Sequence, residues 1–389
     1  MSVTAARGFR AAGIAAGLKA GGGRDLALVV NDGPSDAAAA VFTRNRIQAA
    51  PVLWSRQVLA GGRVSAVVLN SGGANACTGP GGFQDTHATA ETTATALGHN
   101  AAEVVVCSTG LIGERLPMHR LLPGVHTAVA ALDPGPDAAA AAADAIRTTD
   151  RAVKQAQGGT GGGTGGWTVG GMAKGAGMLA PSLATMLVVL TTDADCDAVT
   201  LDRALRAATS RTFDRVDSDG CMSTNDTVVL LASGASGRRP EYDEFGEVLT
   251  EVCADLARQL VADAEGASKD IAIEVVGAAS EDDAVEVGRA VARSNLLKCA
   301  IAGEDPNWGR ALAAVGTTDA TFGPQQVDIA MNAVAVCRGG VIGEPRELVD
   351  LSGREVRITV DLHAGPAAAT VWTNDLTADY VHENSAYST

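Results

Sequence analysis

The stretch from Met172 to Leu187 constrains this chain more than any other part of its sequence. It begins with the small residues around Gly175 and Gly177, passes through Pro181, and reaches Thr185 directly before the apolar run Met186–Leu190. A short apolar run of this kind is typical of a buried β-strand. The pattern therefore predicts a loop that brings the hydroxyl of a threonine to the start of a buried strand.

A threonine in this position has two interpretations. In the first, Thr185 attacks the carbonyl of Ala184, converts the amide into an ester, and is released by water as a new N-terminus with both a hydroxyl and a free amine. Such an amine has a pKa of roughly 7.7–8.0, so it can accept the hydroxyl proton without help from a histidine. In the second, a β-branched threonine heads the strand only because it favours strand geometry.

Length and charge limit the classes of protein to consider. A chain of 389 residues predicts two or three domains. The hydrophobic fraction of 46% supports a sizeable interior, and only 3% of residues are aromatic, so we expect a core of small aliphatic side chains. A net charge of −15 argues against a nucleic-acid partner or an anionic membrane, because both require a basic surface.

Cysteine usage and the N-terminus predict a compartment. The seven cysteines are dispersed without a Cys-x-x-Cys pair, which is typical of a reducing environment. The stretch Met1–Phe9 has no cationic region followed by an apolar core, so no signal peptide is predicted. Apolar runs stop short of the about eighteen residues of a spanning helix. We expect a cytoplasmic protein with no membrane partner.

Strand and helix patterns occur along the whole chain without regular alternation. This irregular order disfavours a wound parallel sheet and predicts an α+β fold, a layered sandwich. A change of composition near Ser268 predicts a catalytic domain over 1–268 and a smaller C-terminal α+β domain over 269–389. The expected strands are 26–30, 39–43, 64–69, 104–107, 226–233, 271–276 and 356–362, and the expected helices are 85–97, one from about 118, 137–146, 198–213, 245–260 and 282–293.

The glycine- and threonine-rich stretch Gly158–Gly166 has too little side-chain content to nucleate regular structure. We expect a mobile surface loop there.

Two other motifs do not fit their sequence context. The segment Lys174–Ala180 fits a loose Gly-x-Gly-x-x-Ala dinucleotide fingerprint, but that fingerprint must follow a strand and open a helix, and here Gly170–Gly171 precede it and a proline follows. Asp217–Gly220 resembles a calcium loop, but Val228 stands where the bidentate carboxylate is needed. The six histidines show no metal-ligand spacing, so no metal site is predicted.

The segment Lys174–Leu187 resembles the self-cleavage site of the ornithine acetyltransferase family, the bifunctional glutamate N-acetyltransferases of arginine biosynthesis. In that family the chain breaks before the threonine of a Lys–Gly–x–Gly–Met–x–x–Pro–x–x–Ala–Thr–Met–Leu segment, which here lies between Ala184 and Thr185. The resemblance extends from Gly8 to Thr389. It implies an N-terminal-nucleophile-like layered α/β/β/α sandwich, cut into an alpha chain 1–184 and a beta chain 185–389.

The same resemblance implies roles for further residues. Cys107–Gly113 matches the family's oxyanion-hole segment, which assigns that role to Thr109 and Gly110; a hydroxyl and a backbone amide in a tight turn can stabilise a tetrahedral oxyanion. An acetylated amino acid with a carboxylate and a distal amine calls for a cation and an acid, such as Lys174 and Glu265. The implied substrate-binding residues are Thr148, Lys174, Thr185, Glu265, Asn384 and Thr389.

The activity implied by the resemblance is transfer of the acetyl group of N-acetylornithine to glutamate through an acetyl-threonine intermediate. It implies no metal and no organic cofactor, leaves acetyl-CoA open as a second donor, and implies an assembly of two alpha and two beta chains or larger. One alternative is an N-terminal-nucleophile amidohydrolase or aminopeptidase, which passes the acyl group to water. The other is a glycine-loop nucleotide-binding regulatory protein, which stays a single uncut chain.

Overall fold

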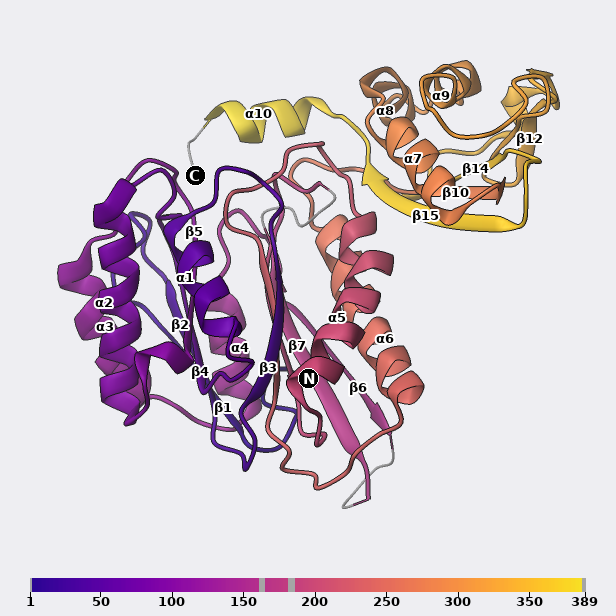
Figure 1. Ribbon diagram of the computed structural model, residues 1–389. Coiled ribbons are helices and arrows are strands. Elements are labelled where there is room, and N and C mark those ends of the chain that lie inside the picture. Colours follow the sequence, from indigo (N-terminus) through magenta and orange to yellow (C-terminus); the bar gives the residue numbers. More distant parts are fainter. Residues whose placement is uncertain (1, 161–164, 181–185, 387–389) are drawn as a thin grey trace.

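The computed structural model describes residues 2–160, 165–180 and 186–386. Two β-sheets lie side by side in its larger part (Figure 1). The first sheet has the order β1-β2-β4-β5, with β1 Phe9–Ile14, β2 Leu26–Asn31, β4 Ala66–Ser71 and β5 Val104–Thr109. The second has the order β3-β9-β8-β7-β6, with β3 Ala37–Phe42, β9 Thr227–Ala232, β8 Leu187–Thr192, β7 Trp167–Lys174 and β6 Lys154–Thr160.

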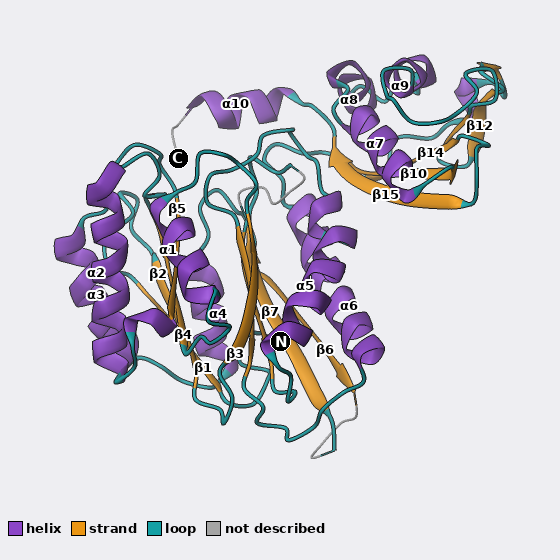
Figure 2. Cartoon of the chain, in the orientation of Figure 1, coloured by secondary structure: helices purple, strands orange, loops and turns teal. Residues whose placement is uncertain are grey.

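Successive residues of β8 face two different cores. Val189 belongs to the core that the two sheets share, whereas Val188 and Leu190 belong to the core between the second sheet and its helices. This is the alternation expected of a strand that is buried on both faces. The outer layers are α2 (Gly79–Leu97) and α3 (Met118–Ala130) on the first sheet, and α5 (Ala198–Arg211) and α6 (Tyr242–Ala262) on the second (Figure 2). The predicted α/β/β/α sandwich is thus confirmed.

Helices cover both edges of the first sheet. On the β5 side lies α1 (Ala50–Leu59), where Trp54 Nε1 donates to the carbonyl of Val104 at 3.0 Å and Ser55 Oγ donates to that of Val106 at 2.8 Å. On the β1 side lies α4 (Pro136–Ala145), whose backbone comes so close to Gly13 that a Cβ there would stand 1.9 Å from the carbonyl oxygen of Ala141. The unpaired edge groups are therefore shielded from other strands.

A third sheet, of order β13-β12-β11-β14-β10-β15, is built from the chain after Lys269. Helices α7, α8 and α9 pack on one of its faces around a separate apolar cluster (Figure 1). The boundary at residue 268 itself stays a prediction. The elements are β10 Asp270–Ala278, α7 Glu281–Ala292, α8 Asn295–Ala302, α9 Trp308–Val315, β11 Asp328–Met331, β12 Val334–Arg338, β13 Val341–Ile342, β14 Glu355–Asp361 and β15 Ala367–Asn374.

The final helix, α10 (Ala378–Ala386), returns to the larger part of the molecule (Figure 1). Thr377 Oγ1 donates to the carbonyl of Gly266 at 2.6 Å, and Arg151 pairs with Glu383. A Cβ at Gly266 would stand 2.1 Å from the backbone nitrogen of Tyr380, so only glycine lets the helix dock here. These contacts bring the C-terminal segment beside the ends of the two central sheets.

The prediction of a loop over Gly158–Gly166 is wrong for part of that stretch. Residues 158–160 are the end of β6 and pair with residues 167–169 of β7, so that Gly158 lies opposite Val169 and Thr160 opposite Trp167. At Gly158 the absence of a side chain also suits a close neighbour, because a Cβ there would stand 3.0 Å from a methyl of Val252 in α6. Cross-strand pairing and helix packing here override the low strand propensity of glycine.

Most predicted elements are present, with shifted ends. The helix expected over 85–97 begins earlier, at Gly79, and the strand expected over 104–107 continues to Thr109. None of the described helices has the length and apolar character needed to cross a membrane. All seven cysteines are free thiols. The described residues also include three short 3-10 helices, at Ala101–Glu103, Phe213–Arg215 and Arg346–Leu348.

Candidate active site

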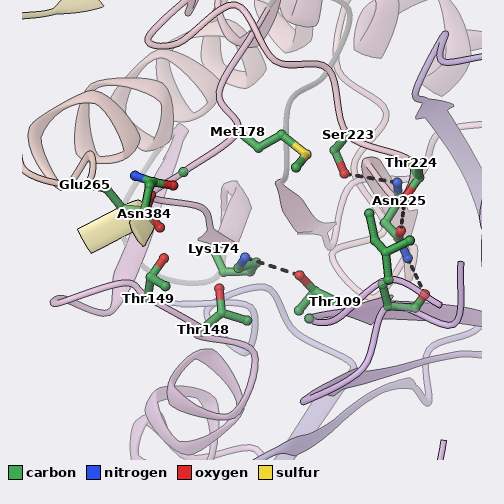
Figure 3. A pocket seen from close by; sticks show the side chains of 14 residues that line it. Thr109, Thr148, Thr149, Lys174, Met178, Ser223, Thr224, Asn225, Glu265 and Asn384 are labelled. Carbon is green, nitrogen blue, oxygen red and sulfur yellow. Dashed lines mark hydrogen bonds between the residues drawn. The ribbon is translucent and has the colours of Figure 1, made fainter. Parts of the chain in front are cut away.

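A pocket of about 110 Å³ lies where the ends of both central sheets meet α6 and α10 (Figure 3). Six of the residues singled out from the sequence line it together: Thr109, Gly110, Thr148, Lys174, Glu265 and Asn384. Ala184, Thr185 and Thr389 lie outside the described residues. The structure therefore gathers residues from five separate segments around one cavity, while their roles stay predictions.

Strand ends supply the centre of the pocket. Thr109 is the last residue of β5 in the first sheet, and Lys174 is the last residue of β7 in the second. The next strand of the second sheet, β8, starts at the same end, since Leu187 pairs with Lys174. Just before it, the backbone N–H of Met186 donates to Asp226 Oδ1 at 3.1 Å. The polypeptide that enters β8 is thus anchored beside the pocket.

Lys174 is 1% exposed, and its Nζ donates to Thr109 Oγ1 at 3.3 Å. Because an ammonium can only donate, the hydroxyl of Thr109 accepts this bond and keeps its own proton for another acceptor. Burial lowers the pKa of Lys174, and the carboxylate of Asp150 opposes that shift. A buried cation beside a hydroxyl with a spare proton can stabilise negative charge that develops in the cavity.

The turn after β5 requires glycine. Gly110 has φ +129°, and a Cβ there would stand 2.5 Å from the backbone nitrogen of Gly73. That same N–H of Gly73 donates to the carbonyl of Thr109 at 3.0 Å. Two loops of the first sheet therefore touch backbone to backbone, and this contact fixes the position of Thr109 at the pocket wall.

Acidic and polar side chains lie on the other side of Lys174 (Figure 3). Glu265 follows α6, and its backbone N–H donates to the carbonyl of Ala176 at 2.9 Å. Its carboxylate lies against Gly177, where a Cβ would stand 2.3 Å from Oε2, so the glycine makes room for the acid. Asn384 comes from α10, and its Nδ2 donates to the carbonyl of Tyr380 at 3.0 Å.

The sequence of this chain matches known proteins over almost its whole length. The profile of the ArgJ family matches residues 10–389. The chain belongs to the ArgJ family. It is 69% identical over 388 residues to "Arginine biosynthesis bifunctional protein ArgJ" of Streptomyces avermitilis, with 100% of both chains covered. It is 56% identical over 391 residues to the protein of that name from Mycobacterium tuberculosis, with 99% of this chain and 96% of the other covered.

A solved structure with the description "Ornithine Acetyltransferase complexed with Ornithine", from Mycobacterium tuberculosis, is 62% identical, covers 47% of this chain and 96% of its own, and has a TM-score of 0.45. Membership of the ArgJ family confirms the resemblance that the segment from Lys174 to Leu187 indicates.

One residue of this ArgJ family member that ties the two sheets together was not assigned a role from the sequence. Asn225 Nδ2 donates to the carbonyls of Ala74 at 2.6 Å and Ser108 at 2.9 Å, and its Oδ1 accepts from Thr224 Oγ1 at 2.6 Å. It thus joins the segment before β9 to the residue preceding Thr109. The polar run 223–226 directly before an apolar strand was the available signal, because polar side chains that are buried beside a strand are usually held by hydrogen bonds.

Two aspartates beside the pocket were also missed. Asp226 is fully buried, and burial raises its pKa well above the usual range, although Met186, Ser223 and Lys174 act in the opposite direction. Asp150 is also buried, and it contacts the backbone on both sides of the pocket. The polar run 223–226 was a signal for Asp226, whereas no local pattern marks Asp150, because single aspartates are usually exposed.

The dinucleotide interpretation fails in a different way from the one expected. Gly170 and Gly171 are part of β7, so the segment from Lys174 does follow a strand. Its described residues, 175–180, contain no helix, and the fingerprint requires one. Within the described ranges, no group of three or more histidine, cysteine, aspartate or glutamate side chains could hold a metal ion.

Proposed function

We propose that this ArgJ family member transfers the acetyl group of N-acetylornithine to glutamate. The observation that carries the proposal is the presence of a buried cation, Lys174, and an acid, Glu265, in one cavity that Thr109 and Gly110 also line. Both amino acids have a carboxylate that Lys174 can bind, and the ornithine moiety also has a distal amine that Glu265 can bind. Charged hydrogen bonds of this kind give both affinity and orientation.

Thr185 is the proposed nucleophile. In maturation its hydroxyl attacks the carbonyl of Ala184, the C–N bond breaks, and the amide becomes an ester with a free amine on Thr185. Water then hydrolyses the ester, which releases the carboxylate of Ala184 and restores the hydroxyl of Thr185. The anchoring of Met186 by Asp226 supports this assignment, because Thr185 is covalently attached to the nitrogen that donates the hydrogen bond. The amine then accepts the hydroxyl proton in each later turnover.

Two acyl transfers complete the cycle. The oxygen of Thr185 forms an ester with the acetyl carbon, the C–N bond of acetylornithine breaks, and the proton held by the amine passes to the departing nitrogen of ornithine. The amine of glutamate next attacks the ester, forms N-acetylglutamate and returns the proton to Thr185. In both steps the hydroxyl of Thr109 and the backbone N–H of Gly110 donate hydrogen bonds to the oxyanion, where negative charge develops.

The remaining parts of the proposal concern maturation and assembly. Chains 1–184 and 185–389 stay together, because β7 and β8 lie on either side of the cut and remain paired in one sheet. We propose an assembly of two alpha and two beta chains or larger in the cytoplasm, with no metal or organic cofactor. Acetyl-CoA remains a candidate second donor, in keeping with the word "bifunctional" in the relatives' names.

The decisive experiment combines a transfer assay with analysis of the purified chain. Labelled acetyl from N-acetylornithine should appear in N-acetylglutamate, and a denaturing gel with N-terminal sequencing should show a second fragment that begins with Thr185. Release of free acetate without transfer would favour the amidohydrolase alternative. A single uncut chain that is stabilised by nucleotide and inactive in transfer would favour the regulatory alternative.

A further inference from the structure

Asp150 contacts two of the segments that carry the proposed substrate-binding residues. Its Oδ2 accepts from the backbone N–H of Thr148 at 3.0 Å, and its Oδ1 accepts from the backbone N–H of Gly175 at 2.6 Å. Thr148 lines the pocket, and Gly175 directly follows Lys174. One buried carboxylate therefore fixes the distance between two walls of the cavity.

A second cation completes this arrangement. The Nζ of Lys154, in β6, donates to Asp150 Oδ1 at 2.7 Å and to Asp263 Oδ2 at 2.5 Å. Asp263 Oδ2 also accepts from the backbone N–H groups of Arg151 at 3.1 Å and Ala152 at 3.2 Å. Asp263 stands two residues before Glu265, so the network reaches the third wall of the pocket as well.

The charges around Lys174 come from several elements. Asp150, Asp226 and Glu265 act to raise its pKa, whereas burial and the neighbouring cation Lys154 act to lower it. Asp150 is the strongest of the opposing charges. Burial by itself would raise the pKa of Asp150, but Lys174, Lys154 and the N–H of Gly175 together lower it to about 2. The carboxylate of Asp150 is thus ionised at neutral pH.

We propose that Asp150 is a positioning residue of the active site, which holds Thr148 and the Lys174–Gly175 turn in register so that Lys174 faces the substrate carboxylate. The negative charge of Asp150 also favours the ammonium form of Lys174. The inference rests on the proposed function for the identity of the substrate carboxylate. The hydrogen bonds and the charge balance are independent of it. Lys154 has the opposite electrostatic effect on Lys174, although it stabilises Asp150.

The pH dependence of activity distinguishes the effect of Asp150 on Lys174 from that of Lys154. The substitution Asp150→Asn should move the basic limb of kcat/KM for N-acetylornithine to lower pH by about 1–3 units, the range expected when a nearby opposite charge is lost. The effect should appear mainly in KM. Lys154→Met should move the same limb to higher pH, because a repelling cation is removed. A purely structural role for the pair would not produce shifts of opposite sign.

Asp193 offers a matched control. It is 1% exposed, accepts from the backbone N–H of Thr168 at 2.7 Å and from Arg7 Nε at 2.7 Å, and lies past the end of β8 opposite the pocket. The substitution Asp193→Asn should lower the thermal midpoint and leave the basic limb where it is in the wild type. The charge assignment would be overturned if the basic limb had the same position in the wild type and in the Asp150 and Lys154 variants. It would also be overturned if the wild type showed no basic limb.

Amide hydrogen exchange tests the positioning without relying on activity. In Asp150→Asn the amides of Thr148 and Gly175 should exchange at least about tenfold faster, since one tenfold step corresponds to about 1.4 kcal/mol of lost protection. Asp193→Asn should leave both unchanged. Unchanged exchange in Asp150→Asn would overturn the positioning role. A wild type that fails to transfer acetyl groups, with exchange altered as expected, would reject the proposed function and leave the positioning role standing.

Discussion

The ammonium of Lys174 donates a 3.3 Å hydrogen bond to the hydroxyl of Thr109, and this bond connects the end of β7 in one sheet to the end of β5 in the other. The two residues are 65 positions apart in the chain. Their contact places a cation and a hydroxyl proton at the same wall of the pocket. If the proposed function is right, the cation also polarises the hydroxyl that stabilises the oxyanion.

The first prediction concerns Thr185. Thr185→Ala should give one uncut chain with no transfer activity, because the same hydroxyl performs both reactions. Thr185→Ser should be cut slowly and keep some turnover, since the hydroxyl survives and only the restricted χ1 rotamer is lost. Intact mass and a transfer assay check both outcomes. Cleavage after Ala184 in the alanine variant would contradict the mechanism.

The second prediction concerns the hydroxyl of Thr109. Thr109→Val keeps the shape of the side chain and removes both the acceptor of Lys174 and the proposed oxyanion donor. We expect kcat to fall by about 10²–10³, the usual effect of losing one such donor. Thr109→Ser should retain much more activity. If the valine variant turned over as fast as the wild type, the oxyanion donors would have to lie elsewhere.

The third prediction uses two glycines with positive φ. In Gly110→Ala the new Cβ would stand 2.5 Å from the backbone nitrogen of Gly73, whereas Gly113, with φ +89°, has no atom within 4 Å of the corresponding position. Both variants acquire a strained backbone, at about 1 kcal/mol or more. Only Gly110→Ala should also lower kcat strongly, because the clash displaces Thr109. Equal kcat values for the two variants, measured with their thermal midpoints, would disprove this account.

The fourth prediction separates the two substrates. Glu265→Gln keeps the size of the side chain beside Gly177 and removes its charge. It should weaken use of N-acetylornithine by about 1.5–3 kcal/mol in kcat/KM, the value of a charged hydrogen bond, and should affect glutamate much less, because glutamate has no distal amine. Steady-state kinetics with each substrate varied in turn test this. The same loss for both substrates would reject the assignment of Glu265 to the amine.

The fifth prediction concerns acid stability. The pKa of Asp150 is about 2 in the folded protein, against an ordinary value of 3.8. A carboxyl with a lowered pKa in the folded state stabilises it above the ordinary pKa, and that contribution disappears as the pH falls through the lower value. The difference in unfolding free energy between the wild type and Asp150→Asn should therefore shrink by about 2 kcal/mol from pH 5 to pH 2.

Denaturant titrations of both proteins at several pH values measure this fifth effect. A difference that stays constant over the whole range would show that Asp150 acts only through its hydrogen bonds.

The local sequence pattern was sufficient to predict the helices and strands that form the layers of the fold. The spacing of Phe245, Leu249, Val252, Leu256 and Leu260 predicts the amphipathic α6, and all five side chains are buried. Apolar runs likewise predict β2, β4, β5 and β9. The prediction from sequence was wrong where tertiary contacts decide the conformation. The glycines at the end of β6 form a strand, not the predicted loop, because β7 pairs with them.

The sequence by itself determined the family and the candidate chemistry, because the Lys174–Leu187 and Cys107–Gly113 segments are contiguous and can be read without the fold. Only the tertiary structure decided that Thr148, Lys174, Glu265 and Asn384 share one cavity, since they lie far apart in the chain. It also revealed Asp150 as the link between two of these segments. The physical reason is that a buried charge is stable only among its partners, and those partners come from strands and loops that no local pattern brings together.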